Sequence, residues 1–315
     1  GRSIWMLDDL TVLHQIQPNK TSQKTILYKP KQSYRTKGRG GKSSLTAGTN
    51  LPNGVIIHYY IKDFDDEKDK VELQFKSSNG ELIKVYSTKD KENKLTVKAG
   101  GNSFVWDTRY DGAERLKGMI FWSASFSGAK AVPGEYSVSL LVNGKEQTQN
   151  FDILPDPRSE SSVAEMQKQF DFVNDVNKTV DKAHKAIKNI RKIRSKLSDF
   201  EKQNKADSTA TKLIAQSKDI QGKLLEVEKT LYQTQNRSNQ DPLNFPIRLT
   251  NKLGHLNRLI TMDDFPPTAQ DTAVKDILSA EVQAAMKTYQ ELINTDVAAF
   301  NTAFKNEKRN YLNIE

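Results

Sequence analysis

The hydrophobic pattern of this chain changes its period once, at residues 154–158, and that change limits the folds open to it. Before the change, apolar residues recur at every second position, as in Tyr136, Val138 and Leu140, which buries one face of a β-strand. After it, they recur every three to four positions, which is typical of amphipathic helices. The boundary contains two prolines, which cannot continue a strand ladder. The sequence therefore predicts a β domain over 51–157 and a helical domain over 158–315.

The β domain is predicted from short strands separated by turn signals. Asn79-Gly80 and Asn143-Gly144 accept positive φ at low cost and therefore favour tight hairpins. Seven or eight such strands over about 100 residues are typical of an antiparallel immunoglobulin-like (Ig-like) β-sandwich. The candidate strands cover 55–61, 71–76, 81–86, 94–97, 104–107, 119–126, 135–142 and 147–153.

Four amphipathic stretches after the boundary predict helices. They cover 160–204, 207–233, 245–262 and 268–309. Ser159 or Ser162 is expected to cap the first helix, and Glu165, three residues after Ser162, would complete a capping box with it. Four such helices joined by short loops favour an antiparallel four-helix bundle. The two long outer helices are expected to pack against each other like a coiled coil.

The first residues form an apolar, β-prone segment that cannot bury its side chains alone. It contains Ile4, Trp5, Met6 and Leu7. A lone strand leaves its backbone groups unpaired. We therefore expect residues 1–16 to be the end of a larger sheet formed by preceding polypeptide, and the chain to be a C-terminal fragment.

Residues 17–50 carry eight Lys and Arg and no Asp or Glu, against a net charge of +9 for the whole chain. Their glycines and serines predict an exposed basic linker. Gly41-Lys42-Ser43 resembles the end of a phosphate-binding loop, but Thr36 stands where such a loop needs its first glycine. A flexible basic loop is the preferred interpretation.

The sequence excludes several kinds of site. It has no Cys, which excludes disulfides, thiol nucleophiles and Cys-based metal sites. No two of its four His lie within five positions of each other, which excludes a helical zinc motif. Acidic residues at 63–69 have a spacing that suits Ca²⁺, but the lysines among them favour a solvated loop. The sequence contains no run of about 18 apolar residues, so it predicts no transmembrane helix. We predict no catalytic residue, cofactor or metal site in this chain.

Two candidate binding surfaces remain. Trp106, Tyr110 and Trp122 would offer an aromatic platform for sugar rings, although strand patterns around both tryptophans favour the core. The first helix carries eight Lys and Arg between 178 and 196, which would meet phosphates or an acidic glycan. No aromatic residues are interleaved with them and no nucleic-acid motif accompanies them, so nucleic acid is not the expected partner. A solvated helix face is the preferred interpretation.

Several segments match the motifs of one known family in the family's order. Residues 1–10, GRSIWMLDDL, resemble GRGIWVLDDL, and residues 50–60, NLPNGVIIHYY, resemble NPPYGAVIxYY. Residues 101–110, GNSFVWDTRY, resemble GxNRFVWDxRY. Residues 133–138, PGEYSV, and 154–158, LPDPR, resemble PGxYTV and DPR. The chain is therefore similar to the C-terminal region of bacterial proteins with sortilin-like, BNR-repeat β-propellers, which are often described as glycosyl-hydrolase-like.

The resemblance implies a multidomain α+β protein, in which residues 4–7 complete the last propeller blade before the Ig-like domain and the helical extension. Leu51 and Ser103 depart from the family pattern, which has Pro and Arg there. The implied function is a non-catalytic accessory and interaction region. One alternative is a supporting part of a glycoside hydrolase-like enzyme whose site lies on the propeller. A second is binding of an acidic polymer by the basic linker and the first helix.

The resemblance also implies partners and a location. The preceding propeller polypeptide is the first partner, and a glycan or another envelope protein is the second. The implied location is extracytoplasmic: periplasmic, cell-surface or secreted.

Overall fold

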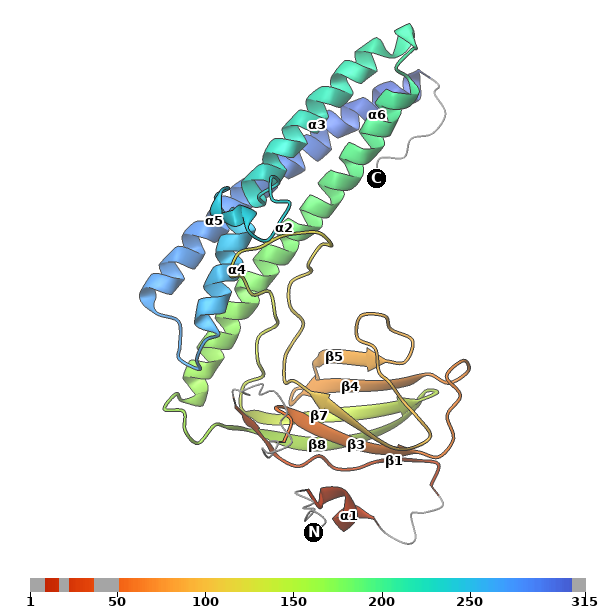
Figure 1. The fold of residues 1–315 in the computed structure, drawn as a ribbon, viewed down its shortest axis with the longest axis vertical. Helices are drawn as coiled ribbons and strands as arrows, with labels where there is room; N and C mark the ends of the chain where they lie inside the picture. Colours follow the sequence, from red (N-terminus) through yellow and green to blue (C-terminus); the bar gives the residue numbers. More distant parts are fainter. Residues whose placement is uncertain (1–8, 17–22, 37–50, 308–315) are drawn as a thin grey trace, which may run out of the picture. The chain divides into compact units, whose positions relative to one another are not determined.

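The computed structural model describes residues 9–16, 23–36 and 51–307, and it has a mixed α+β architecture (Figure 1). These residues divide into two compact units. The β unit comprises Gly1–Asp111 and Ala129–Phe170, and the helical unit comprises Gly112–Gly128 and Asp171–Glu315. The predicted propeller strand, residues 4–7, lies outside the described residues.

The β unit contains two sheets. Their strand orders are β1-β3-β6 and β2-β8-β7-β4-β5. Each described strand pair is antiparallel except β2 with β8, which run parallel, in contrast to the fully antiparallel arrangement that the sequence predicts. The strands are β1 (Thr25–Leu27), β2 (Ser33–Arg35), β3 (Val55–Ile61), β4 (Val71–Ser77), β5 (Leu82–Ser87), β6 (Gly100–Trp106), β7 (Gly134–Val142) and β8 (Lys145–Pro155).

One hydrophobic core lies between the two sheets. Trp106 on β6 is fully buried and stacks on Phe75 of β4, with 4.6 Å between ring centroids. Tyr136 and Phe151 pack edge-on against the same indole ring. Burial of a side chain of this kind contributes about 1.5–3 kcal/mol. The prediction that Trp106 belongs to the core is confirmed.

Two strands lie inside the segment that the sequence predicts as an exposed basic linker. Leu27 of β1 is buried, and Arg35 of β2 is 1% exposed. Arg35 donates from Nε to the carbonyl of Ala131 at 3.1 Å and from Nη2 to Gln169 Oε1 at 3.0 Å. Strands of three residues are too short to show a hydrophobic period. A buried cation also needs partners, and those of Arg35 lie far along the chain. The rest of this range, 17–22 and 37–50, lies outside the described residues.

Segment 112–128 contains no strand, although the sequence predicts one over 119–126. Its Met119 and Phe126 are buried in the core of the helical unit. Asn251 takes the place of a partner strand, because its side chain accepts from the Trp122 amide at 2.7 Å and donates to the Trp122 carbonyl at 2.8 Å. The alternation of apolar residues in this segment therefore serves a helical core.

The helical unit is built from the four predicted helices, with differences at their ends. The capping box of the first is confirmed: Glu165 Oε2 accepts from the Ser162 amide at 2.8 Å, and Ser162 Oγ accepts from the Glu165 amide at 3.3 Å. The last predicted helix is divided by a π-helix, η4. The elements are α2 (Val163–Gln203), η2 (Ser208–Ala210), α3 (Thr211–Leu231), η3 (Asp241–Leu243), α4 (Leu249–Ile260), α5 (Ala269–Leu292), η4 (Ile293–Val297) and α6 (Ala298–Asn306).

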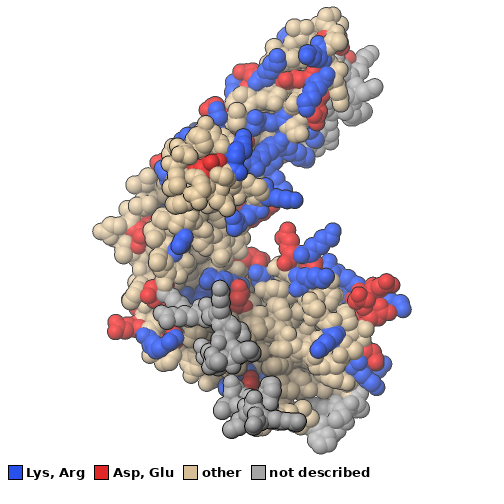
Figure 2. Space-filling model, in the orientation of Figure 1, with Lys and Arg blue, Asp and Glu red and all other residues tan. Residues whose placement is uncertain are grey.

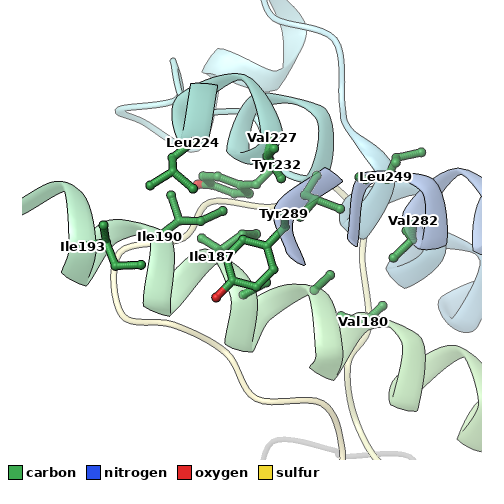
Figure 3. Packing of buried hydrophobic residues seen from close by; sticks show 14 of the residues in the cluster. Val180, Ile187, Ile190, Ile193, Leu224, Val227, Tyr232, Leu249, Val282 and Tyr289 are labelled. Atoms are coloured by element: carbon green, nitrogen blue, oxygen red, sulfur yellow. The ribbon is translucent and has the colours of Figure 1, made fainter. Parts of the chain in front are cut away.

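The core of the helical unit follows the buried side of α2 (Figure 3). Ile187 and Ile190 of α2 lie beside Leu224 of α3, and Val282 and Tyr289 of α5 approach the same cluster (Figure 3). The hydroxyl of Tyr289 accepts from Asn189 Nδ2 at 2.7 Å, so its one buried polar atom is satisfied.

Gly254 is the point where α4 lies closest to segment 112–128. A Cβ atom there would lie 2.6 Å from Phe126 Cε1 and 2.9 Å from Ala124 Cβ. The Phe126 ring cannot easily move away, because Phe121 and His184 pack against it at 4.6 and 5.4 Å between ring centroids. Gly222 in α3 offers a matched comparison, since a Cβ there would meet nothing within 4 Å.

We expect Gly254→Ala to lower the free energy of unfolding by about 1–3 kcal/mol through overpacking. Gly222→Ala should raise it by up to about 1 kcal/mol, because alanine favours the helix. Urea unfolding followed by circular dichroism measures both changes. If Gly254→Ala were as stable as Gly222→Ala, the described packing of Phe126 on α4 would be wrong.

Candidate functional site

A groove of about 730 Å³ lies on the side of the three-stranded sheet that faces away from the core. Val55, Ile57 and Tyr59 of β3 point into the core, so His58 and Tyr60 point the opposite way. On β6, Ser103 lies opposite His58, and Gly101 lies opposite Tyr60. These small residues leave space beside the two rings, and this space forms the floor of the groove.

The short helix α1 (Thr11–Gln15) and the residue after it form one wall of the groove, through Val12 and Ile16. The side chain of Gln15 holds α1 in place. It donates from Nε2 to the carbonyl of Lys29 at 2.9 Å and accepts from the Lys29 amide at 2.8 Å. A side-chain amide thereby pairs with the main chain as a neighbouring strand would.

Asp9 lies just before Leu10, the N-cap residue of α1. Its Oδ1 accepts from the backbone amide of Thr11 at 2.9 Å and also from the Thr11 hydroxyl. These hydrogen bonds lower the pKa of Asp9 from its ordinary value. The carboxylate is therefore ionised near neutral pH, where it favours the N-terminus of a helix.

The groove combines ring faces with a few polar atoms. Tyr28, His58 and Tyr60 supply the aromatic surface, while Lys98 and Ser103 supply polar groups. Tyrosine offers an apolar face and a hydrogen-bonding tip, which suits either an extended peptide or a sugar ring. These groups give the groove the chemistry of a binding surface.

The structure does not bring Trp106, Tyr110 and Trp122 together on one surface. Trp106 is inside the core of the β unit, and Tyr110 packs edge-on against Phe170 at 4.7 Å between centroids. Burial raises the pKa of Tyr110. Trp122 belongs to the helical unit and is 43% exposed, so the prediction that it lies in the core of the β domain is wrong. The sequence alone does not reveal the groove, because only the register of β3 with β6 creates its floor.

A row of lysines runs along the exposed side of α2, and we call it the lysine face. Figure 2 shows Lys and Arg gathered along one edge of the helical unit. The lysine face consists of Lys178, Lys182, Lys185, Lys188, Lys192 and Lys196. Their spacings of three or four residues place them on one side of the helix over about 27 Å. Lys185 pairs with Asp181 and Lys188 pairs with Glu114, each at 2.6 Å.

The two arginines beside this face are bound to α3. Arg191 Nε lies 2.7 Å from Glu228 Oε1, and Arg194 Nη1 lies 3.2 Å from Glu228 Oε2. Glu228 is 3% exposed, and a buried carboxylate requires such partners. The arginines therefore serve helix packing, and the lysines form the exposed charge.

Three features of the sequence remain: the acidic residues at 63–69, the lack of a predicted transmembrane helix and the Gly41-Lys42-Ser43 loop. Within the described ranges, no group of three or more His, Asp or Glu has the geometry of a metal site. Asp65 and Asp69 instead accept from backbone amides of their own loop. No helix in the described part of the chain is long and apolar enough to cross a membrane. Gly41-Lys42-Ser43 lies outside the described residues.

Comparisons with known proteins do not identify the chain. No family model matches it, and no curated protein matches it. A solved chain titled "pT26-6p" aligns over 79% of this chain with 13% sequence identity and a TM-score of 0.11. This chain spans 47% of that one, and a TM-score so low carries no argument about fold or function. Nothing in these comparisons links the chain to sortilin-like or BNR-repeat proteins.

Replacing Gln15 by Ala should loosen α1, because it removes both hydrogen bonds to Lys29. At about 1 kcal/mol for each bond, hydrogen exchange at the amides of His14 and Ile16 should quicken by about 5- to 30-fold. Exchange measured by NMR reports the change. His14→Ala, an exposed position on the same helix, is the control and should leave the Ile16 rate unchanged. Equal rates in the wild-type and Gln15→Ala proteins would mean that another contact holds α1.

Proposed function

We propose that this chain is a non-catalytic accessory and interaction region of a larger, extracytoplasmic protein. In this proposal an Ig-like sandwich and a four-helix bundle follow a sortilin-like β-propeller, and residues 4–7 complete its last blade. The order of the matched motifs supports the proposal. The two sheets around one core and the set of long helices are compatible with it.

The observation that carries the proposal is the attachment of α1 by Gln15. Helix α1 follows residues 4–7 after only a few positions, and the two bonds to Lys29 hold it at the wall of the groove. A polypeptide paired with residues 4–7 would therefore be brought to the β unit at this groove. Leu10, Leu13 and Ile16 are 43%, 54% and 51% exposed there, which leaves apolar surface for it to cover.

The pairing would use the physics of strand addition. Main-chain hydrogen bonds to the last blade provide affinity, and alternate side chains of residues 4–7 provide specificity. Closing the ring also removes an exposed sheet edge, which is an aggregation hazard in propellers as in other sheets. In this proposal the aromatic groove binds the propeller polypeptide, and a glycan would compete for the same groove.

Hydrogen exchange tests the proposal. In the isolated chain residues 4–7 have no blade to join, so their amides should exchange much faster than those of Ile57 and Tyr59 in β3. In the intact protein they should be protected to a similar degree as β3. Protection of residues 4–7 in the isolated chain would show that they pair within it, and the proposal would fail.

The lysine face favours a second function, binding of an acidic polymer. The six lysines follow one another at helical spacing, about 5–6 Å apart, and although Lys185 and Lys188 pair with acids, such a row suits a chain of phosphates or sulfates. The attraction between such charges is screened by salt. Binding of this kind should therefore weaken steeply as salt rises.

Inorganic polyphosphate is a suitable probe. We expect Lys178→Ala with Lys182→Ala to weaken its binding several-fold and to reduce the dependence of affinity on salt between about 50 and 200 mM. Lys212→Ala with Lys218→Ala makes the same change of charge on exposed positions of α3 and serves as the control. Titration calorimetry measures both. If both double variants lost the same affinity for polyphosphate, the effect would come from the net charge of the chain. The lysine face would then not be a binding site.

A further inference from the structure

Five large apolar side chains are exposed where α4 connects to α5, and we call them the α4–α5 patch. Each is between 45% and 65% exposed. The patch consists of Leu259, Met262, Phe265, Val274 and Ile277. The two on α5 lie within about 12 Å of the start of that helix, and the others lie at the end of α4 or in the connection. Single exposed apolar residues are ordinary, but five within 19 consecutive residues indicate a binding surface.

The backbone that carries the patch is held firmly. Pro266 and Pro267 restrict the connection. Thr268 then caps α5 with a complete capping box: Thr268 Oγ1 accepts from the Asp271 amide at 3.1 Å, and Asp271 Oδ2 accepts from the Thr268 amide at 2.9 Å. The patch is therefore preorganised, which lowers the entropy cost of binding.

The surroundings of the patch are acidic, in contrast to the positive charge of the whole chain. Residues 259–285 contain five Asp and Glu, of which Asp264 is buried, and one basic residue, Lys275. Lys275 is only 18% exposed, because its ammonium lies over the ring of Phe172 at 5.3 Å and 3.7 Å from Asp175. The same ammonium also lies 3.8 Å from Oδ1 of Asp276, which is 67% exposed. Arg258, next to Leu259, donates to Ser123 Oγ at 2.8 Å.

From this combination, we propose that the α4–α5 patch is the docking surface for a basic amphipathic helix of a partner protein. The apolar side of that helix, with residues at spacings of three and four, would cover the patch. Its flanking Lys and Arg would face the acidic rim. Burial of the apolar side chains supplies most of the affinity, and the opposite charges steer the encounter and set the orientation.

Charge decides against two other occupants. A second copy of this chain docked by a twofold axis would bring one acidic rim against the other, and like charges in an interface are costly. An anionic lipid surface would repel the same rim. A basic helix, by contrast, would be attracted to the acidic rim. The proposal is independent of the propeller and of the lysine face.

The test uses two synthetic amphipathic helices of about 18 residues, one built from Leu and Lys and one from Leu and Glu. We expect the Leu/Lys peptide to bind the full chain and the Leu/Glu peptide not to bind. Fluorescence anisotropy measures the dissociation constants. Phe265→Asp with Ile277→Asp should weaken binding at least about tenfold, whereas Leu82→Asp, at a 52% exposed site on β5, should not change it.

A second variant examines the charge of the rim. Asp276→Asn with Glu281→Gln keeps the apolar side chains, and it should weaken binding and reduce its dependence on salt. Circular dichroism verifies that each variant keeps its helix content. Equal affinity for the two peptides, or the same affinity in the wild-type and Phe265→Asp/Ile277→Asp chains, would overturn the proposal. So would a dimer in light scattering that this double variant abolishes, because the patch would then bind a second copy.

Discussion

The helical unit depends on burying a non-helical segment, and that is possible only if the backbone groups of the segment find partners. Segment 112–128 places Phe121 and Phe126 among the helices, but it brings unpaired amides and carbonyls with them. The helices supply side chains to satisfy these groups. Asn177 Nδ2 donates to the carbonyl of Ser127 at 2.9 Å, and the Tyr232 hydroxyl accepts from the Ile120 amide at 2.8 Å. His184 donates from Nδ1 to the carbonyl of Glu114, and burial lowers its pKa, so the ring stays neutral. These polar residues specify one position for the segment.

Sequence periodicity was sufficient for the long elements and insufficient where partners lie far along the chain. The helices from α2 to α5 and strands such as β3 follow from spacing alone, since each buries one regular face. Strands β1 and β2 are three residues long, and Arg35 is buried through bonds to Ala131 and Gln169 that no local pattern reveals. The alternation in segment 119–126 is real, but the partner of that segment is a helical core and not a sheet. For the groove, the sequence shows which side of β3 is exposed. It does not show the register that places Ser103 and Gly101 beside the rings of β3.

The two surfaces of the helical unit have opposite character, although they belong to neighbouring helices. The lysine face of α2 is strongly charged and contains no apolar anchor, so it favours long-range, salt-sensitive attraction. The α4–α5 patch has apolar anchors inside an acidic rim, so it favours short-range burial with charge used for orientation. The chain's net charge of +9 therefore describes neither surface, and the two would select different classes of partner. Lys275 is the one basic residue within 259–285, and its ammonium contacts Phe172 and Asp175 as well as the rim residue Asp276.

Segment 112–128 also has a consequence for how this protein can be inherited and rearranged. The chain passes from one unit to the other at three places, after Asp111, after Gly128 and after Phe170. A gene fusion that joins or removes the helices at a single point near Phe170 would separate them from Met119 and Phe126, which complete their core. Recombination can move such helices intact only together with the strands that flank the inserted segment. The two units should therefore descend as one cassette, and cutting the gene at the apparent period change would leave both products incomplete.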